Sequence, residues 1–168
     1  MARRTRNRRR REIGALGWAW RGAAAGAAGT TALDAVSYLD IAIRGRPSSS
    51  TPERSVEKLA GLAHVTIPGQ GELRRNRLQG LGALTGYASG IGIGVLVGLA
   101  RAAGVRTSPA VGTALISGGV LVATNGPMTV LGITDPRTWS AADWISDLLP
   151  HLAYGSVVKA TLDALDRR

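Results

Sequence analysis

Apolar residues gather in four long stretches that are separated by polar connections. The stretches cover about residues 16–43, 78–100, 109–131 and 141–166, and the longest polar connection covers residues 45–77. The second stretch carries no ionisable side chain between Arg77 and Arg101. As a helix it would be about 35 Å long, enough to cross a bilayer core of about 30 Å. The pattern predicts an all-α, polytopic membrane helix bundle of about four transmembrane helices, with residues 14–168 forming a single membrane domain.

Glycines recur at four-residue spacing in this chain, and they predict close contact between helices. The second stretch contains Gly82, Gly86, Gly90, Gly94 and Gly98, and the first contains Gly22 and Gly26. In water each glycine costs a helix roughly 1 kcal/mol relative to alanine. In lipid the backbone must hydrogen-bond to itself, so the helix persists. Small residues at this spacing let two backbones approach each other, which predicts glycine-zipper (small-xxx-small) packing.

A glycine row at this spacing drifts around its helix. Each step of four residues turns the helix by about 40°, so five glycines sweep about 160° of its surface. One straight neighbour cannot cover all of them. Two interpretations stay open: other helices of the same chain cover the rest of the row, or a second copy covers it in a homo-oligomer.

The polar connection 45–77 predicts a short amphipathic helix of its own. Thr51 is a suitable cap residue, Pro52 suits the first helical position and Glu53 suits the first turn. One face would be apolar, formed by Val56, Leu59, Ala60 and Ala63. Such a helix could lie flat on the membrane or cover one end of the bundle.

Two prolines fall inside the later apolar stretches. Asn125 and Gly126 precede Pro127, and this sequence predicts that the third helix ends there, because proline lacks an N–H and disfavours helical geometry at the residue before it. Pro150 predicts a kink or a restart in the last helix. That helix should begin with a capping box formed by Ser140 and Asp143.

The N-terminus is strongly basic, in a chain of formal net charge +10. Its arginines are Arg3, Arg4, Arg6, Arg8, Arg9, Arg10 and Arg11. A basic block directly before a membrane span is typical of a cytoplasmic segment and can rest on anionic lipid headgroups. Nucleic-acid binding is disfavoured, because no aromatic residue in the block could stack on bases. We therefore expect residues 1–13 to form a cytoplasmic tail, and four spans would then place the C-terminus inside as well.

Ionisable residues inside apolar stretches are the candidates for function. Each costs at least roughly 2.5 kcal/mol to insert into a membrane, so Asp34, Asp147 and His151 need partners. We expect them to meet near Asn125, where a carboxylate beside an imidazole could hold and pass protons. A purely structural role stays open, with Asp34 bonded to neighbouring hydroxyl groups and Asp147 at headgroup level.

Enzyme chemistry is not visible in the sequence. No phosphate-binding loop, zinc-protease motif, nucleophile elbow or dinucleotide fingerprint is present. Cysteine is absent, and the two histidines, His64 and His151, fall in different segments. We therefore expect no catalytic activity, no cofactor and no metal.

The C-terminal third resembles the YagU-type family of small bacterial inner-membrane proteins. The residues that carry this resemblance are the block AsnGlyProMetThrValLeuGlyIleThrAspPro at 125–136, followed by Trp139 or Trp144 and by ProHisLeuAlaTyrGly at 150–155. The resemblance implies a multi-pass protein of the bacterial inner membrane, a link to acid tolerance and a proton-sensitive role for His151. Two functions stay open: a proton-responsive or conduit-forming oligomer linked to acid or envelope stress, and a noncatalytic accessory or assembly subunit of a larger membrane complex.

Overall fold

The computed structural model describes residues 14–167, and in this part of the chain all regular structure is helical. The basic tail, with its proposed contacts to lipid headgroups, lies outside the described residues. Five α-helices and one 3-10 turn follow one another. They are α1 (Ala15–Arg44), α2 (Thr51–Leu62), α3 (Gly71–Ala102), α4 (Pro109–Val130), η1 (Pro136–Thr138) and α5 (Ala141–Asp166). The predicted all-α fold is confirmed.

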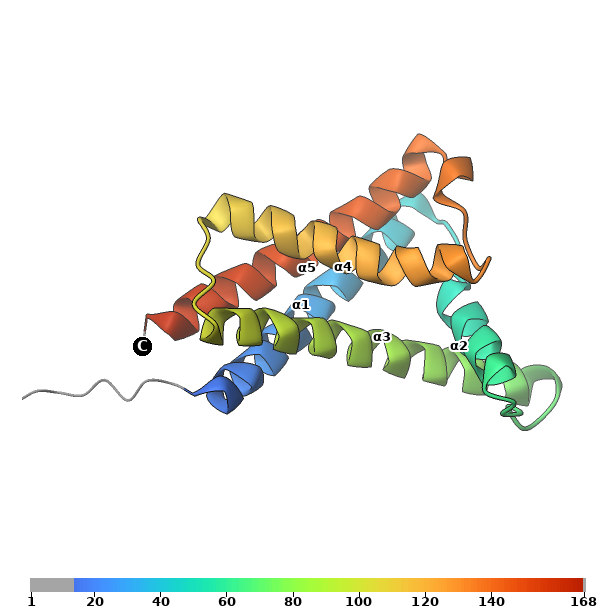
Figure 1. The fold of residues 1–168 in the computed structure, drawn as a ribbon. Coiled ribbons are helices and arrows are strands. Elements are labelled where there is room, and N and C mark those ends of the chain that lie inside the picture. Colours follow the sequence, from blue (N-terminus) through green and yellow to red (C-terminus); the bar gives the residue numbers. More distant parts are fainter. Residues whose placement is uncertain (1–13, 168) are drawn as a thin grey trace, which may run out of the picture.

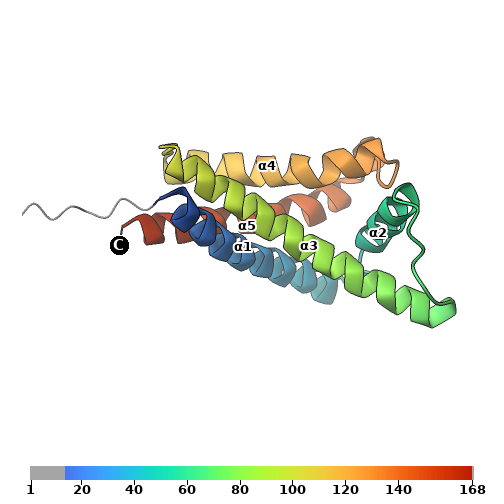
Figure 2. The same ribbon diagram turned by 60° about the horizontal axis from the view of Figure 1, so that its bottom comes forward.

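Four long helices run lengthwise and the short α2 lies at one end (Figures 1 and 2). The start of α1, the α3–α4 connection and the end of α5 lie together at the opposite end (Figure 1). Helix α1 packs against both α3 and α5, and α4 packs against α5. In contrast, α3 and α4 barely touch each other.

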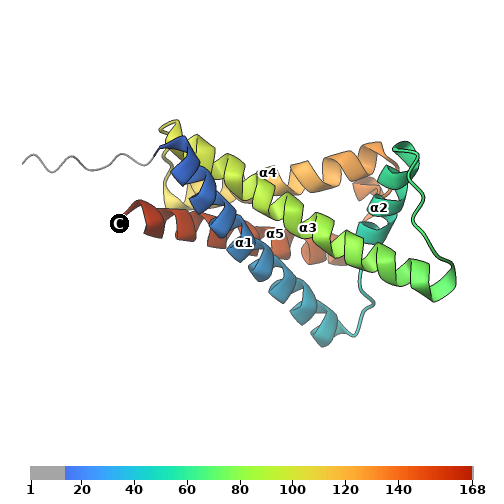
Figure 3. The ribbon, with the colours of Figure 1, turned by 90° about the horizontal axis from the view of Figure 1, so that it is seen from below.

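Helices α1 and α3 touch through backbone rather than side chains. A Cβ atom added to Gly26 would lie 2.6 Å from the Gly90 carbonyl oxygen, and one added to Gly94 would lie 2.5 Å from the Gly26 Cα. Gly98 meets the backbone of Trp18 and Gly22 in the same way. Figure 3 shows the two helices close together near the start of α1 and diverging toward its end. Glycine is required in this contact because no side chain fits between the two backbones.

The remaining glycines of the row have other neighbours. Gly82 faces α2, where an added Cβ would lie 2.9 Å from the Pro52 Cβ. Nothing lies within 4 Å of a Cβ added to Gly86. The row therefore serves two intramolecular contacts, and Gly86 takes part in neither.

The predicted short helix is present, and its start differs slightly from the expectation. The capping position is Ser50 rather than Thr51. Pro52 lies in the first turn, as does Glu53. Since α2 packs against α3, it covers one end of the bundle.

The predicted break at Asn125–Pro127 is wrong. Helix α4 continues through Pro127 and ends at Val130, and Gly132, two residues later, has a left-handed φ of 67°. The Ile133 N–H closes this end by donating to the Met128 carbonyl at 2.8 Å. Pro127 costs the helix only the one hydrogen bond that its missing N–H would donate to the Ala123 carbonyl. Helix α5 likewise passes Pro150 without restarting.

Only α3, among the described residues, is both long and apolar enough by composition to be a candidate membrane span. Helices α1 and α5 contain several charged residues, and α4 has none but is shorter and includes Asn125 and Pro127. The four membrane spans therefore stay a prediction.

Candidate functional site

The candidate site is a polar cluster between α4 and α5. Ser140 and Asp143 form the predicted capping box, with Ser140 Oγ accepting from the Asp143 N–H at 3.2 Å and Asp143 Oδ2 accepting from the Ser140 N–H at 2.9 Å. This cap sets where α5 begins. Asp147 and His151 then follow one turn apart on one stripe of the helix.

The connection before α5 is held by its own ion pair. Arg137 donates from its side chain and from its backbone N–H to Asp135, and this lowers the pKa of the Asp135 carboxyl. A lowered pKa means that the pair stabilises the fold above the ordinary carboxyl pKa and that this contribution is lost as the pH falls. Trp139 and Trp144 pack edge to face with 5.0 Å between ring centroids, which fixes the connection against α5.

Asn125, Asp147, His151 and Thr124 form a chain of polar contacts, each with the next. Asn125 Nδ2 donates to Asp147 Oδ2 at 2.7 Å. His151 Nδ1 lies 2.7 Å from the Asp147 carbonyl oxygen and 3.6 Å from its Oδ1. On the other side of the ring, Nε2 lies 3.3 Å from Thr124 Oγ1. The side chains of His151 and Asp147 are 12% and 21% exposed, so the imidazole is largely shielded.

This geometry allows two hydrogen-bond patterns that differ by one proton. Because a carbonyl oxygen can only accept, the hydrogen on His151 Nδ1 is fixed toward the Asp147 carbonyl. Thr124 Oγ1 also lies 2.9 Å from the Val120 carbonyl, and its hydroxyl has a single hydrogen. In the neutral ring, Thr124 donates to Nε2. In the imidazolium, Nε2 donates to Thr124 Oγ1, and the Thr124 hydroxyl donates to the Val120 carbonyl instead. The Asp147 carboxylate then balances the positive charge of the ring.

Asp34 is not part of this cluster. It lies on α1, on the side that faces Tyr87 of α3. No hydrogen bond or ion pair in residues 14–167 joins Asp34 to Asp147, His151 or Asn125. The expectation that all four residues meet is therefore wrong for Asp34, because the α1 face that carries it turns toward α3.

A buried ion network at the opposite end of the bundle was missed by the sequence reasoning. Arg101 on α3 pairs with Asp163 and, at 2.9 Å, with Asp166. Lys159 pairs with Asp163, and Arg106 pairs with Asp166 at 3.1 Å. Arg101 and Lys159 are only 7% and 4% exposed. The four-residue spacing of Lys159 and Asp163 was a usable signal, but the pairing with α3 depends on how the helices pack.

A second network lies at the end of α1. Asp40 pairs with Arg44 at 3.3 Å and with Arg46, and it accepts from Ser146 Oγ of α5 at 3.0 Å. This network ties the end of α1 to the first turns of α5, where the candidate site begins.

No group of three potential metal ligands occurs within the described part of the chain. His64 lies in the turn after α2, far along the chain from His151, with a positive φ of 56°. The candidate site is thus a group of hydrogen-bonding side chains around one imidazole.

No protein-family model, curated protein or solved structure matches this chain. The resemblance to the YagU-type family therefore stays a prediction.

Proposed function

We propose that the chain is a multi-pass protein of the bacterial inner membrane, with α1, α3, α4 and α5 crossing the bilayer. The observation that supports this is the outer surface of the bundle, where more large apolar side chains are exposed than are buried. Every long helix contributes, for example Ile43 on α1 (75% exposed), Leu96 on α3 (65%) and Leu115 on α4 (63%). An apolar surface of this extent favours contact with lipid or with other proteins over water.

Cysteine labelling tests the four crossings. The chain has no cysteine, so each single-cysteine variant is labelled at one site only. In cells treated with a membrane-impermeant maleimide, we expect labelling of Ser49→Cys and Thr138→Cys, which lie outside in this topology. Ala103→Cys and Arg167→Cys should react only after the membrane is opened. If α3 alone crossed the membrane, Thr138→Cys would behave like Ala103→Cys, and the proposal would be wrong.

We further propose that the Thr124–His151–Asp147–Asn125 cluster makes the protein responsive to protons. Imidazole is the side chain whose charge can change between pH 5 and 8. The cluster supplies a carboxylate for the charged ring and a hydroxyl that can reverse its hydrogen bond. Protonation on one face of α5 would thus be transmitted to the α4 backbone through Thr124, in keeping with a role in acid or envelope stress.

Histidine NMR tests this site directly. In a His64→Gln background His151 is the only histidine, so its ¹⁵N resonances report a single ring. We expect the neutral ring to carry its hydrogen on Nδ1 and the charged ring to carry a second one on Nε2. Thr124→Val should shift the Nε2 resonance of the neutral ring, because Nε2 loses the hydroxyl group beside it.

Thr129→Val is the matched control, since Thr129 bonds the Asn125 carbonyl on the exposed side of the same helix. It should leave the Nε2 resonance unchanged. In proteoliposomes, proton flux should depend on pH and lose that dependence in His151→Gln. A neutral ring protonated on Nε2, or an Nε2 resonance indifferent to Thr124→Val, would contradict the proposal.

A noncatalytic accessory role is the second candidate, and one observation favours it. Added Cβ atoms at Gly86 and Gly92 on α3, and at Gly118 on α4, would meet nothing within 4 Å. These positions leave flat strips of backbone on the outside of the bundle, where a helix of a second copy or of a larger membrane complex could pack. The mass of the detergent-solubilised protein distinguishes a symmetric homo-oligomer from a subunit that co-purifies with other chains.

A further inference from the structure

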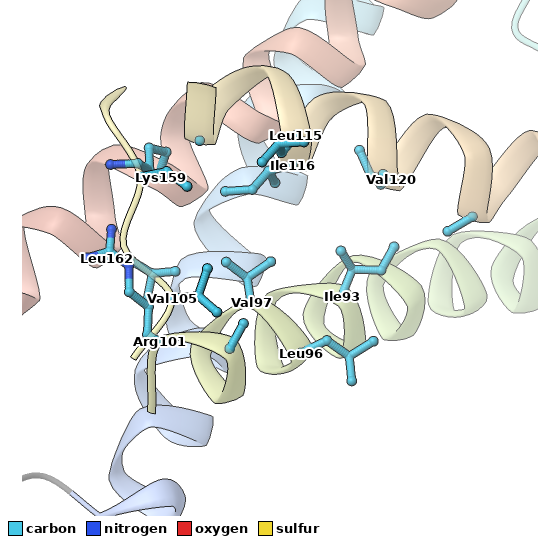
Figure 4. A pocket seen from close by; sticks show the side chains of 15 residues that line it. Ile93, Leu96, Val97, Arg101, Val105, Leu115, Ile116, Val120, Lys159 and Leu162 are labelled. Atoms are coloured by element: carbon cyan, nitrogen blue, oxygen red, sulfur yellow. The ribbon is translucent and has the colours of Figure 1, made fainter. Parts of the chain in front are cut away.

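A mostly apolar cavity of about 390 Å³, open to the outside of the bundle along one side, lies between α3 and α4 (Figure 4). It exists because these two helices barely touch, each packing instead against the α1–α5 pair. Its walls include Ile93 and Val97 from α3 and Leu115, Ile116 and Val120 from α4. The volume lies within the range of roughly 300–1,000 Å³ that is usual for small-molecule sites.

One end of this cavity is positively charged. Arg101 and Lys159 line it there, with their nitrogen atoms at the same end in Figure 4. Three cations, Arg101, Lys159 and Arg106, share two carboxylates, Asp163 and Asp166. The network therefore keeps one net positive charge, and Lys159 has only Asp163 as an ion-pair partner among the described residues.

The cavity also has the length of one bilayer leaflet. It follows α3 from Ile93 to Arg101 and α4 from Gly112 to Ala123, which correspond to about 12 Å and 16 Å of helix. Half of a hydrocarbon core of about 30 Å is about 15 Å. In the four-span arrangement, the charged end lies near the membrane surface and the apolar end lies near the midplane.

The geometry points to a binding site for one anionic phospholipid. One acyl chain occupies the cavity and the phosphate lies against Arg101 and Lys159, where it neutralises the remaining positive charge. This assignment rests on the proposed membrane location, and it adds a specific ligand to it. Charge complementarity favours a lipid over an apolar helix of another protein, because such a helix would leave that charge uncompensated.

Two neighbouring glycines provide a matched test. Gly119 lines the cavity and Gly118 does not. A Cβ added at either position meets nothing within 4 Å, so neither substitution clashes with the protein itself. Leucine at Gly119 fills the cavity, whereas leucine at Gly118 points elsewhere.

The experiment is native mass spectrometry of the full chain, delipidated in detergent and then given phosphatidylglycerol or phosphatidylcholine. We expect the unmodified protein and Gly118→Leu to retain one phosphatidylglycerol per chain, at least about tenfold more tightly than phosphatidylcholine. Gly119→Leu should retain phosphatidylglycerol about tenfold more weakly. Circular dichroism melting in detergent checks that both variants stay folded.

Three outcomes would overturn the site. They are equal retention of phosphatidylglycerol by Gly119→Leu, equal retention of the two lipids by the unmodified protein, and a dimer that Gly119→Leu dissociates, which would assign the cavity to a second copy. The cysteine-labelling pattern reads the membrane topology independently. A correct pattern with no lipid preference rejects the lipid site alone, whereas a wrong pattern rejects the topology.

Discussion

Replacing Gly94 with leucine is expected to separate α1 from α3 and to destabilise the bundle by about 3 kcal/mol. The added Cβ alone would lie 2.5 Å from the Gly26 Cα and 2.7 Å from its nitrogen. These are backbone atoms of a helix, so they cannot turn aside as a flexible side chain could. The measurement is the midpoint of thermal unfolding in detergent, followed by circular dichroism and by size-exclusion elution.

Gly92→Leu is the control, because it lies two residues away on the same helix. A Cβ added to Gly92 meets nothing within 4 Å. We expect this variant to unfold at or above the temperature of the unmodified protein, since leucine has the higher helix propensity. Equal behaviour of the two variants would show that α1 and α3 do not rely on the backbone contact.

The glycine spacing predicted that close helix contacts exist, but it could not identify their partners. Gly90, Gly94 and Gly98 face α1, Gly82 faces α2 and Gly86 faces open space. The angle between two helices decides how far a row stays in contact, and this angle depends on the whole bundle. The row therefore predicts the kind of packing, and the three-dimensional structure decides which glycines take part.

The part of the candidate site that lies on a single helix was predicted correctly, because residue spacing alone determines which side chains share a face. Asp147 and His151 share a face because they are four residues apart. Asn125 was expected nearby because the helix was predicted to break there, and the structure contradicts that reason. The expectation for Asp34 was wrong because the neighbours of Asp34 depend on how α1 is rotated toward α3. The sequence of α1 alone does not determine that rotation. The predicted break at Pro127 was wrong for a different reason, since a proline removes only one helix hydrogen bond and α4 stays packed against α5.

Replacing Asp163 with asparagine is expected to cost about 3–5 kcal/mol, because it leaves a buried cation without its partner. Lys159 is 4% exposed and pairs with Asp163, which also pairs with Arg101. The same substitution at Asp166 should cost less, for two reasons. Arg101 would still pair with Asp163. Arg106 could turn to solvent, because its side chain is 47% exposed. The midpoints of thermal unfolding in detergent give this order directly.

The double variant Asp163→Asn, Lys159→Met separates the loss of a charge pair from the loss of packing. If the cost arises from the unpaired ammonium group, an apolar side chain of similar length should restore most of the stability, since replacing both members of a buried pair is often neutral. A double variant as unstable as Asp163→Asn would instead assign the cost to Arg101. The carboxylate would then act mainly to hold the end of α3 against α5, and Lys159 would contribute little to the fold.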